Sequence, residues 1–214
     1  MAVKVDTSEI QFFFKAAAIH AKRLVNKSID SYNSLLQIDA ESAKEIHNEL
    51  GDSLEAKGNY DGAIKAYKKI MLADPNNVAT LFKLGKIYVR LGQNADAIEA
   101  LKKVTILDST IPEAYYLLGS VYFSDDANNE AWEAFNNAIT LNPGYADAYY
   151  KLGLIADARH DQDNAIKAYL KTIDLKPDFI KAYQSLGFVY EAKGNRDEAV
   201  KYFKKSLEIE QKKS

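Results

Sequence analysis

Five glycines recur at intervals of 34 residues, and this period constrains the fold more than any other feature of the chain. They are Gly51, Gly85, Gly119, Gly153 and Gly187. A leucine precedes each glycine, and the residue three positions after it is Leu54, Tyr88, Tyr122, Ala156 or Tyr190. A fixed period of this length indicates a stack of similar units in which each unit contacts its neighbours. The sequence therefore predicts an array rather than a single globular core.

The period divides the chain into five clear units: 44–77, 78–111, 112–145, 146–179 and 180–213. In each unit, a first helix is predicted to run over the glycine. The second helix begins near a small residue, which is Ala63, Ala97, Ala131, Ala165 or Ala199. Four residues later comes a larger one: Tyr67, Leu101, Phe135, Tyr169 or Phe203. Small residues permit two helices to approach closely, and large ones fill the space beside them.

The segments between these helices carry the residues expected at helix ends. A left-handed stop of the first helix is predicted at Gly58, Gly92 and Gly194. Side-chain caps of the second helix are predicted at Asn59, Asp161 and Asn195. Proline ends three of the second helices, at Pro75, Pro143 and Pro177.

This combination of Leu-Gly, Tyr, Ala, Phe or Tyr, and Pro resembles the tetratricopeptide repeat (TPR) family over at least residues 44–213. The resemblance implies an all-α fold, a TPR superhelical solenoid of antiparallel helix pairs with a concave groove. It also implies a function in protein binding, without catalysis.

The period fails at the N-terminus. Ala17 stands 34 residues before Gly51, and the second helix of this segment matches the following unit only at an offset of 35. Ala40 stands in place of the proline. We therefore expect residues 1–43 to form a degenerate N-terminal helical unit.

A second irregularity lies in the middle of the array. Ser109 stands where other units have proline, and Pro112 comes three residues later. We predict altered stacking and a hinge near 109–113, which divides repeats 1–2 (residues 44–111) from repeats 3–5 (residues 112–214).

Composition argues against several classes of function. The chain has no cysteine and a net charge of −2, so a disulfide framework, a thiolate zinc site and a nucleic-acid partner are not expected. The stretch DARHDQD around His160 lacks the glycine and terminal glutamate of a calcium loop, so a polar turn is the preferred interpretation. No run of 18 apolar residues and no signal-peptide pattern occur. We expect no enzyme activity, cofactor or metal, no membrane insertion, and a cytoplasmic location.

Three aromatic residues on the first helices are the candidate binding residues. Phe82, Tyr116 and Tyr150 each follow a core residue of the first helix, so they point off the core-facing stripe. The family resemblance implies that this position lines the concave groove. The expected groove residues are Phe82, Lys83, Lys86, Val89, Arg90, Tyr116, Ser120, Phe123, Tyr150, Lys151 and Leu154. The alternative is that the rings only pack against neighbouring first helices.

The kind of ligand can be narrowed from the same positions. The basic and amide clamp that chaperone-binding TPR proteins use for a terminal carboxylate is absent from the matching residues, among them Asn48, Asp52 and Ser120. An amphipathic helix or an extended segment with apolar anchors suits this groove better.

Both ends of the array carry apolar residues that need a partner. Val200 and Leu207 stand where another unit buries Ile166 and Ile173, yet no further helix pair follows. Solenoids usually end in a polar cap, so these side chains are either tolerated exposures or a contact with another molecule. At the other end, Phe12, Phe13 and Phe14 could cap the array, bind a membrane surface, or dock into a neighbouring molecule.

The whole plan resembles magnetosome-associated TPR proteins, through its length, its divergent first unit, its five repeats and the ending KYFKKSLEIE. That resemblance implies a self-assembling scaffold on the cytoplasmic face of magnetosome vesicles, with itself and magnetosome membrane proteins as partners. A monomeric adaptor or co-chaperone that holds a foreign peptide is the alternative. A TPR subunit of an enzyme complex is a third.

Overall fold

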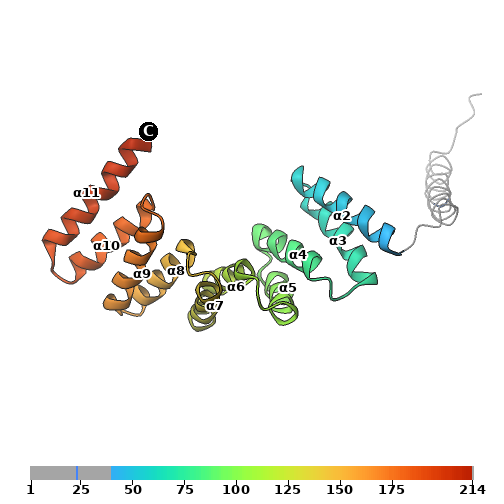
Figure 1. The fold of residues 1–214 in the computed structure, drawn as a ribbon, viewed down its shortest axis with the longest axis horizontal. Coiled ribbons are helices and arrows are strands. Elements are labelled where there is room, and N and C mark those ends of the chain that lie inside the picture. Colours follow the sequence, from blue (N-terminus) through green and yellow to red (C-terminus); the bar gives the residue numbers. More distant parts are fainter. Residues whose placement is uncertain (1–22, 24–39, 214) are drawn as a thin grey trace, which may run out of the picture.

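The computed structural model describes residue 23 and residues 40–213, and every regular element in the second range is an α-helix (Figure 1). Phe12, Phe13 and Phe14 lie outside the described residues. The helices are α2 (Ala40–Ala56), α3 (Tyr60–Ala73), α4 (Val78–Leu91), α5 (Asn94–Leu107), α6 (Pro112–Ser124), α7 (Asn128–Leu141), α8 (Ala146–Ala158), α9 (Gln162–Leu175), α10 (Ile180–Ala192) and α11 (Arg196–Lys213).

The helices pack as consecutive pairs, α2 with α3, α4 with α5, α6 with α7, α8 with α9, and α10 with α11. The second helix of each pair also packs on the first helix of the next pair. The pairs follow an arc, with α4 and α6 on its inner side and α5 and α7 on its outer side (Figure 1). The predicted all-α TPR solenoid is confirmed.

The 34-residue period has a direct cause in the packing within each pair. A Cβ atom built on Gly119 would lie 2.9 Å from the ring of Phe135 on the partner helix. The other repeated glycines face the residue sixteen positions later in the same way. These five contacts set the closest approach of the two helices in every pair, so any larger residue would force them apart.

The turns inside the pairs confirm the predicted helix ends. Gly58, Gly92 and Gly194 have φ values of +74°, +67° and +77°. The two turns without a glycine use Asp126 and His160 in the same left-handed conformation, with φ values of +57° and +59°. The side chains of Asn59, Asp161 and Asn195 accept hydrogen bonds from the first turn of the helix that follows. His160 thus belongs to a structural turn.

The first helices of the later units begin at 78, 112, 146 and 180. The described range from residue 40 onward opens inside a helix, α2, so the predicted boundary between residues 43 and 44 stays a prediction.

Asp108 organises the irregular junction near residue 109. Its carboxylate accepts hydrogen bonds from the backbone nitrogen and the hydroxyl of Thr110, at 2.9 and 2.6 Å. Pro112 occupies the first turn of α6, where its missing N–H is tolerated. A buried cluster containing Leu101, Val104 and Leu118 continues across the junction. The hinge at 109–113 stays a prediction.

Candidate protein-binding surfaces

The three aromatic residues predicted for the groove are half-buried between neighbouring elements. The Tyr116 ring centroid lies 5.7 Å from that of Phe135 and 4.8 Å from that of Tyr145. The Tyr150 ring similarly lies 5.7 Å from Tyr169 and 4.9 Å from Phe179. Each ring therefore contacts the second helix of its own pair and the residue that precedes the next pair. Part of each ring stays exposed, so groove lining remains a prediction.

Phe82 and the remaining apolar positions show the same partial burial. Phe82 and Val89 pack on the cluster around Leu101. Phe123 and Leu154 pack on the clusters of the third and fourth pairs. These four side chains therefore support the stacking of the pairs, and only their outer parts are available to a ligand.

Lys83 joins the first two pairs through a polar cluster on α2. Its Nζ lies 2.9 Å from Asn48 Oδ1 and 2.5 Å from Asp52 Oδ1. The Tyr67 hydroxyl donates to the same Asp52 oxygen at 2.6 Å. Burial alone would raise the pKa of Asp52, but the hydrogen bonds from Lys83 and Tyr67 and the charge of Lys83 outweigh it and hold that pKa below its ordinary value. This cluster is internally satisfied and so serves the fold.

Lys86 and Arg90, also predicted for the groove, make contacts to neighbouring pairs. Lys86 Nζ lies 3.3 Å from Glu113 on α6. Arg90 donates to the Tyr60 hydroxyl at 2.6 Å and its guanidinium lies over the Tyr60 ring. The Ser120 hydroxyl donates to the backbone carbonyl of Tyr116 at 2.8 Å. An exposed ion pair such as Lys86–Glu113 contributes little to stability and can be exchanged for a ligand contact.

Lys151 differs from the other groove lysines because it is half-buried and has no carboxylate within ion-pair distance among residues 40–213. Its Nζ lies 5.0 Å from the centroid of the Phe123 ring. Burial lowers the pKa of Lys151, the charge of Lys181 lowers it further, and Asp147 partly opposes both. A partner that placed a carboxylate or carbonyl here would stabilise the charged ammonium.

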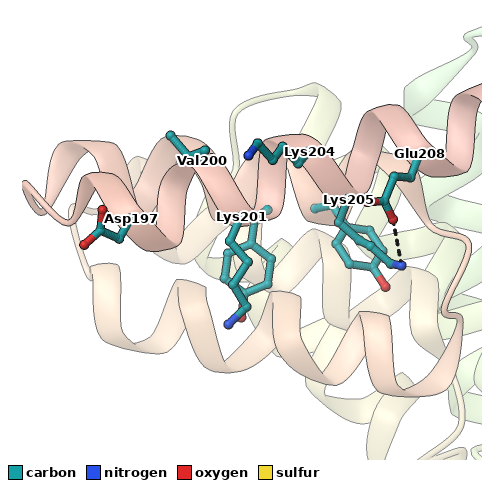
Figure 2. Close-up of a pocket in the computed structure, with 8 residues that line it drawn as sticks. Asp197, Val200, Lys201, Lys204, Lys205 and Glu208 are labelled. Carbon is teal, nitrogen blue, oxygen red and sulfur yellow. Dashed lines mark hydrogen bonds and ion pairs between the residues drawn. The ribbon is translucent and has the colours of Figure 1, made fainter.

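The terminal face of α11 is the second candidate surface. Val200 and Leu207 are 51% and 55% exposed, whereas Ile166 and Ile173 at the equivalent positions of α9 pack on a core cluster that includes α10. The predicted exposure of the two terminal side chains is confirmed. Beside them lies a shallow depression of roughly 600 Å³, lined by Tyr183 and by residues of α11 (Figure 2).

A polar contact between consecutive pairs recurs along the array, and our sequence reasoning missed it. In each case the end of a first helix meets the start of the preceding second helix. The contacts are Arg90 with Tyr60, Asp125 with Asn94 at 2.5 Å, Arg159 with Asn129 at 2.7 Å, and Lys193 with Asp163 at 2.5 Å. The signal in the sequence was a polar residue five or six positions after the repeated glycine, five for Arg90 and six for Asp125, Arg159 and Lys193.

Trp132 takes part in this same junction. It occupies the place of an isoleucine or valine in the other units. The ring packs on buried residues of the third pair and of the fourth. The Arg159 guanidinium, at the end of α8, lies 5.2 Å from it. Trp132 therefore contributes to the packing between two consecutive pairs.

The described part of the chain has neither a metal-binding cluster nor a membrane-spanning helix. No group of three or more histidine, aspartate or glutamate side chains there is arranged to hold a metal ion. None of its helices combines the length and the apolar character needed to span a membrane.

Comparison with known proteins shows the family to which the chain belongs. Tetratricopeptide repeat models match residues 21–78, 54–121 and 180–213, and a TPR repeat model matches 121–156 and 158–194. The chain belongs to the tetratricopeptide repeat family, whose members bind other proteins. A TPR repeat-containing protein of Methanocaldococcus jannaschii is 34% identical over 93 residues, and the chain spans only 16% of its length.

Within this family the chain resembles MamA. One crystal structure of MamA is 60% identical, covers 77% of this chain and 96% of its own, and superimposes with a TM-score of 0.74. A second is 57% identical, covers 81% and 94%, and has a TM-score of 0.76. MamA of Desulfovibrio magneticus RS-1 is 26% identical over 79% of this chain and 96% of its own, with a TM-score of 0.75.

Proposed function

We propose that this protein is a non-catalytic scaffold that self-assembles and recruits other proteins on the cytoplasmic face of magnetosome vesicles. The similarity to MamA over nearly the whole length of that protein supports the magnetosome role. The observation that carries self-assembly is the exposure of Val200 and Leu207 on α11, because the equivalent residues of the earlier second helices are partly buried.

In this proposal, the recruiting surface is the inner face of the arc, which we define by Phe82, Tyr116, Tyr150 and Lys151. Half-buried rings at Phe82, Tyr116 and Tyr150 offer apolar contact area, and Lys151 offers a partly desolvated positive charge. An amphipathic helix or extended segment with apolar anchors and one acidic residue matches this arrangement.

Self-assembly is tested on the full chain by light scattering coupled to size exclusion over a range of concentrations. The proposal expects masses that are multiples of one chain and that rise with concentration. A single-chain mass at every concentration contradicts it. If such a monomer still captured a foreign protein, it would favour the adaptor alternative.

Recruitment is tested by capture of magnetosome membrane proteins with immobilised full chain. Lys151→Glu should lose captured protein, because it reverses the charge on the inner face. Lys167→Glu is the matched control, since Lys167 is an exposed lysine of α9 outside the inner face. Equal capture by both variants would remove the inner face from the proposal.

A further inference from the structure

Two side chains of the second helices are more exposed than any other large apolar residue of the described chain. Leu72 of α3 and Ile106 of α5 are 85% and 81% exposed. They stand 34 residues apart and so occupy the same position in consecutive pairs. Packed pairs lie on both sides of α5, so the exposure of Ile106 belongs to this position in the repeat and has nothing to do with an end of the array.

The other described pairs have a polar residue at the same position. It is Thr140 in α7, Asp174 in α9 and Glu208 in α11, and all three are exposed. The fold therefore does not need an apolar side chain here. Because Leu72 and Ile106 have no role in stacking and recur in neighbouring pairs, they are candidates for a contact with another surface.

Lysines share the exposed face of α3 with its apolar residue. Lys65, Lys68 and Lys69 precede Leu72 by seven, four and three residues, so all four lie on one face of the helix. The three lysines are exposed, and none has an ion-pair partner within residues 40–213. This face of α3 therefore carries positive charge that the described chain does not neutralise.

The same motif recurs on α5 as Lys102, Lys103 and Ile106. Lys103 Nζ donates to the backbone carbonyl of Pro75 at 2.7 Å. Pro75 follows Leu72 by three residues, so this hydrogen bond shows that the lysine-bearing faces of the two helices adjoin each other. We name the motifs 68–72 and 102–106 together the outer patch, since the second helices lie on the outer side of the arc, as α5 does in Figure 1.

Charge distinguishes this surface from the outer side of the later pairs. Residues 65–72 and 99–106 contain five lysines and one glutamate, a net charge of +4. The equivalent segments of α7 and α9, residues 133–140 and 167–174, contain two lysines and two acidic residues, a net charge of zero. On α11, two of the equivalent lysines form ion pairs within the helix. The outer patch thus combines net positive charge with exposed apolar side chains.

We propose that the outer patch binds the surface of a membrane that contains anionic lipid. Leu72 and Ile106 enter the boundary between head groups and acyl chains, and the lysine ammonium groups stay among the phosphates. A cluster of four or more lysines on helices is typical of proteins that bind anionic lipid. This inference rests on the vesicle location in the proposed function and names the surface by which the scaffold lies on a vesicle.

Two observations favour lipid over a protein as the occupant. Side chains that are more than four-fifths exposed stand clear of their neighbours, whereas the apolar anchors of a protein interface are seated in well-packed pockets. Lysine is depleted at protein interfaces but is enriched on helices that lie on anionic membranes. A fluid bilayer needs no matching pocket, because its acyl chains close around each apolar side chain.

The test measures co-sedimentation of the full chain with vesicles. Vesicles of phosphatidylcholine with about one third phosphatidylglycerol are compared with vesicles of phosphatidylcholine alone. The wild type should bind the first kind and not the second. Binding should fall as the salt concentration rises to about 1 M, because salt screens the attraction between lysine and phosphate.

Substitutions in the patch should weaken binding to the anionic vesicles. The double variant Leu72→Thr, Ile106→Thr should bind at least about tenfold more weakly, because it loses both apolar anchors and takes the threonine that α7 has at this position. Lys68→Gln and Lys69→Gln should each cost about fivefold, as expected for one charge near an anionic surface. All these side chains are exposed, so the variants should fold, and circular dichroism checks that they do.

Matched controls come from α9. Leu170→Thr and Lys167→Gln change an exposed leucine and an exposed lysine of a second helix outside the patch, and both variants should bind like the wild type. Light scattering should give every variant the mass of the wild type at the concentration used, because a change in assembly would alter the number of patches that bind one vesicle.

The outcomes separate this inference from the proposed function. Equal binding by the wild type and the double threonine variant overturns it and assigns the lipid contact to other residues of the chain. A wild type that binds neither kind of vesicle also overturns it. If the double variant then fails to capture a magnetosome membrane protein that Leu170→Thr captures, the patch is a protein contact. A wild type that binds anionic vesicles as a single chain supports the lipid contact and removes self-assembly from the proposed function.

Discussion

Each repeated glycine lies against the side chain found sixteen residues later on the partner helix, and this contact repeats in all five pairs. Tyr67, Leu101, Phe135, Tyr169 and Phe203 occupy the facing position. The aromatic or leucine side chain fills the space that the absent Cβ leaves. The size of the side chain at the glycine position therefore limits the size of the side chain sixteen residues later, and the reverse also holds.

Gly119→Ala should destabilise the fold in spite of the better helix propensity of alanine. The new methyl group would lie 2.9 Å from the buried Phe135 ring. Overpacking costs about 1–3 kcal/mol, and removing a glycine from a helix returns about 1 kcal/mol, so we expect a net loss of roughly 1 kcal/mol. Urea unfolding measures the change. Combining it with Phe135→Ala should show coupling between the sites; strictly additive losses would contradict the contact.

Tyr67→Phe and Tyr169→Phe should differ although the residues are equivalent. The Tyr67 hydroxyl donates to Asp52 at 2.6 Å, so its removal should cost about 1 kcal/mol. The Tyr169 hydroxyl is buried and makes no hydrogen bond of good geometry among the described residues, and only a weak interaction with Ser185 affects its pKa. Phe135 and Phe203 fill the same position, so removal of this hydroxyl should be neutral or slightly stabilising. Denaturant unfolding at pH 7 measures both, and equal losses would contradict the assignment.

The difference in stability between Tyr67→Phe and Tyr169→Phe should depend on pH, because the Tyr67 hydroxyl is bonded to the carboxylate of Asp52. Burial raises the pKa of Asp52, yet its bonds to Lys83 and Tyr67 bring it below the ordinary value of about 4. The stabilisation is therefore present above about pH 4 and is lost as the pH falls through the lower native pKa. The penalty of Tyr67→Phe should shrink on acidification through that range, whereas the effect of Tyr169→Phe should not change.

At the scale of the element, the array is a series of similar junctions that differ in their connecting turns. Three turns contain proline, and the turn at 108–111 instead uses the Asp108–Thr110 hydrogen bonds. Proline restricts the backbone of a turn more strongly than a hydrogen-bonded serine segment does. This difference is the physical basis for the predicted hinge at 109–113.

The hinge can be measured by distance distributions between spin labels, because the chain has no cysteine of its own. Labels at Glu99→Cys and Glu133→Cys span the junction at 109–113. Labels at Glu133→Cys and Lys167→Cys span the next junction from equivalent exposed positions. A hinge predicts a broader distribution for the first pair of labels. Equal widths would show that the array is uniform across this junction.

At the scale of the whole molecule, stability is distributed along a line rather than around a centre. Among residues 40–213 each pair packs on its neighbours, so the two pairs at the ends of this range have one described junction and the pairs between them have two. The buried clusters likewise follow one another along the chain, from the pair α2–α3 to the pair α10–α11.

Native-state hydrogen exchange should therefore show protection that decreases from the middle to the ends. We expect the amides of α6 and α7 to exchange most slowly and those of α10 and α11 to exchange faster, when measured on Leu207→Glu, which places a charge on the exposed apolar face of α11. In the wild type, protection of α11 should rise with protein concentration. Uniform protection along the array would indicate a single cooperative unit instead.

The repeat length, the paired helices, the turn glycines, the helix caps and the exposed apolar positions of the last helix could all be predicted from the sequence. All of these depend on local conformation or on a contact at constant spacing, and such contacts leave a period in the sequence.

The contacts of the residues predicted for the groove became clear only from the packing of the pairs. Phe82, Tyr116 and Tyr150 share one position in the repeat, and Tyr145 and Phe179 each stand 29 residues after Tyr116 and Tyr150, but the sequence does not say that these rings meet across the junction. The structure likewise showed that Lys83 is satisfied by Asn48 and Asp52 while Lys151 has no carboxylate within ion-pair distance in the described chain. Side-chain partners across a junction depend on the stacking of two units in space, and a constant spacing alone does not say which of the residues so spaced are in contact.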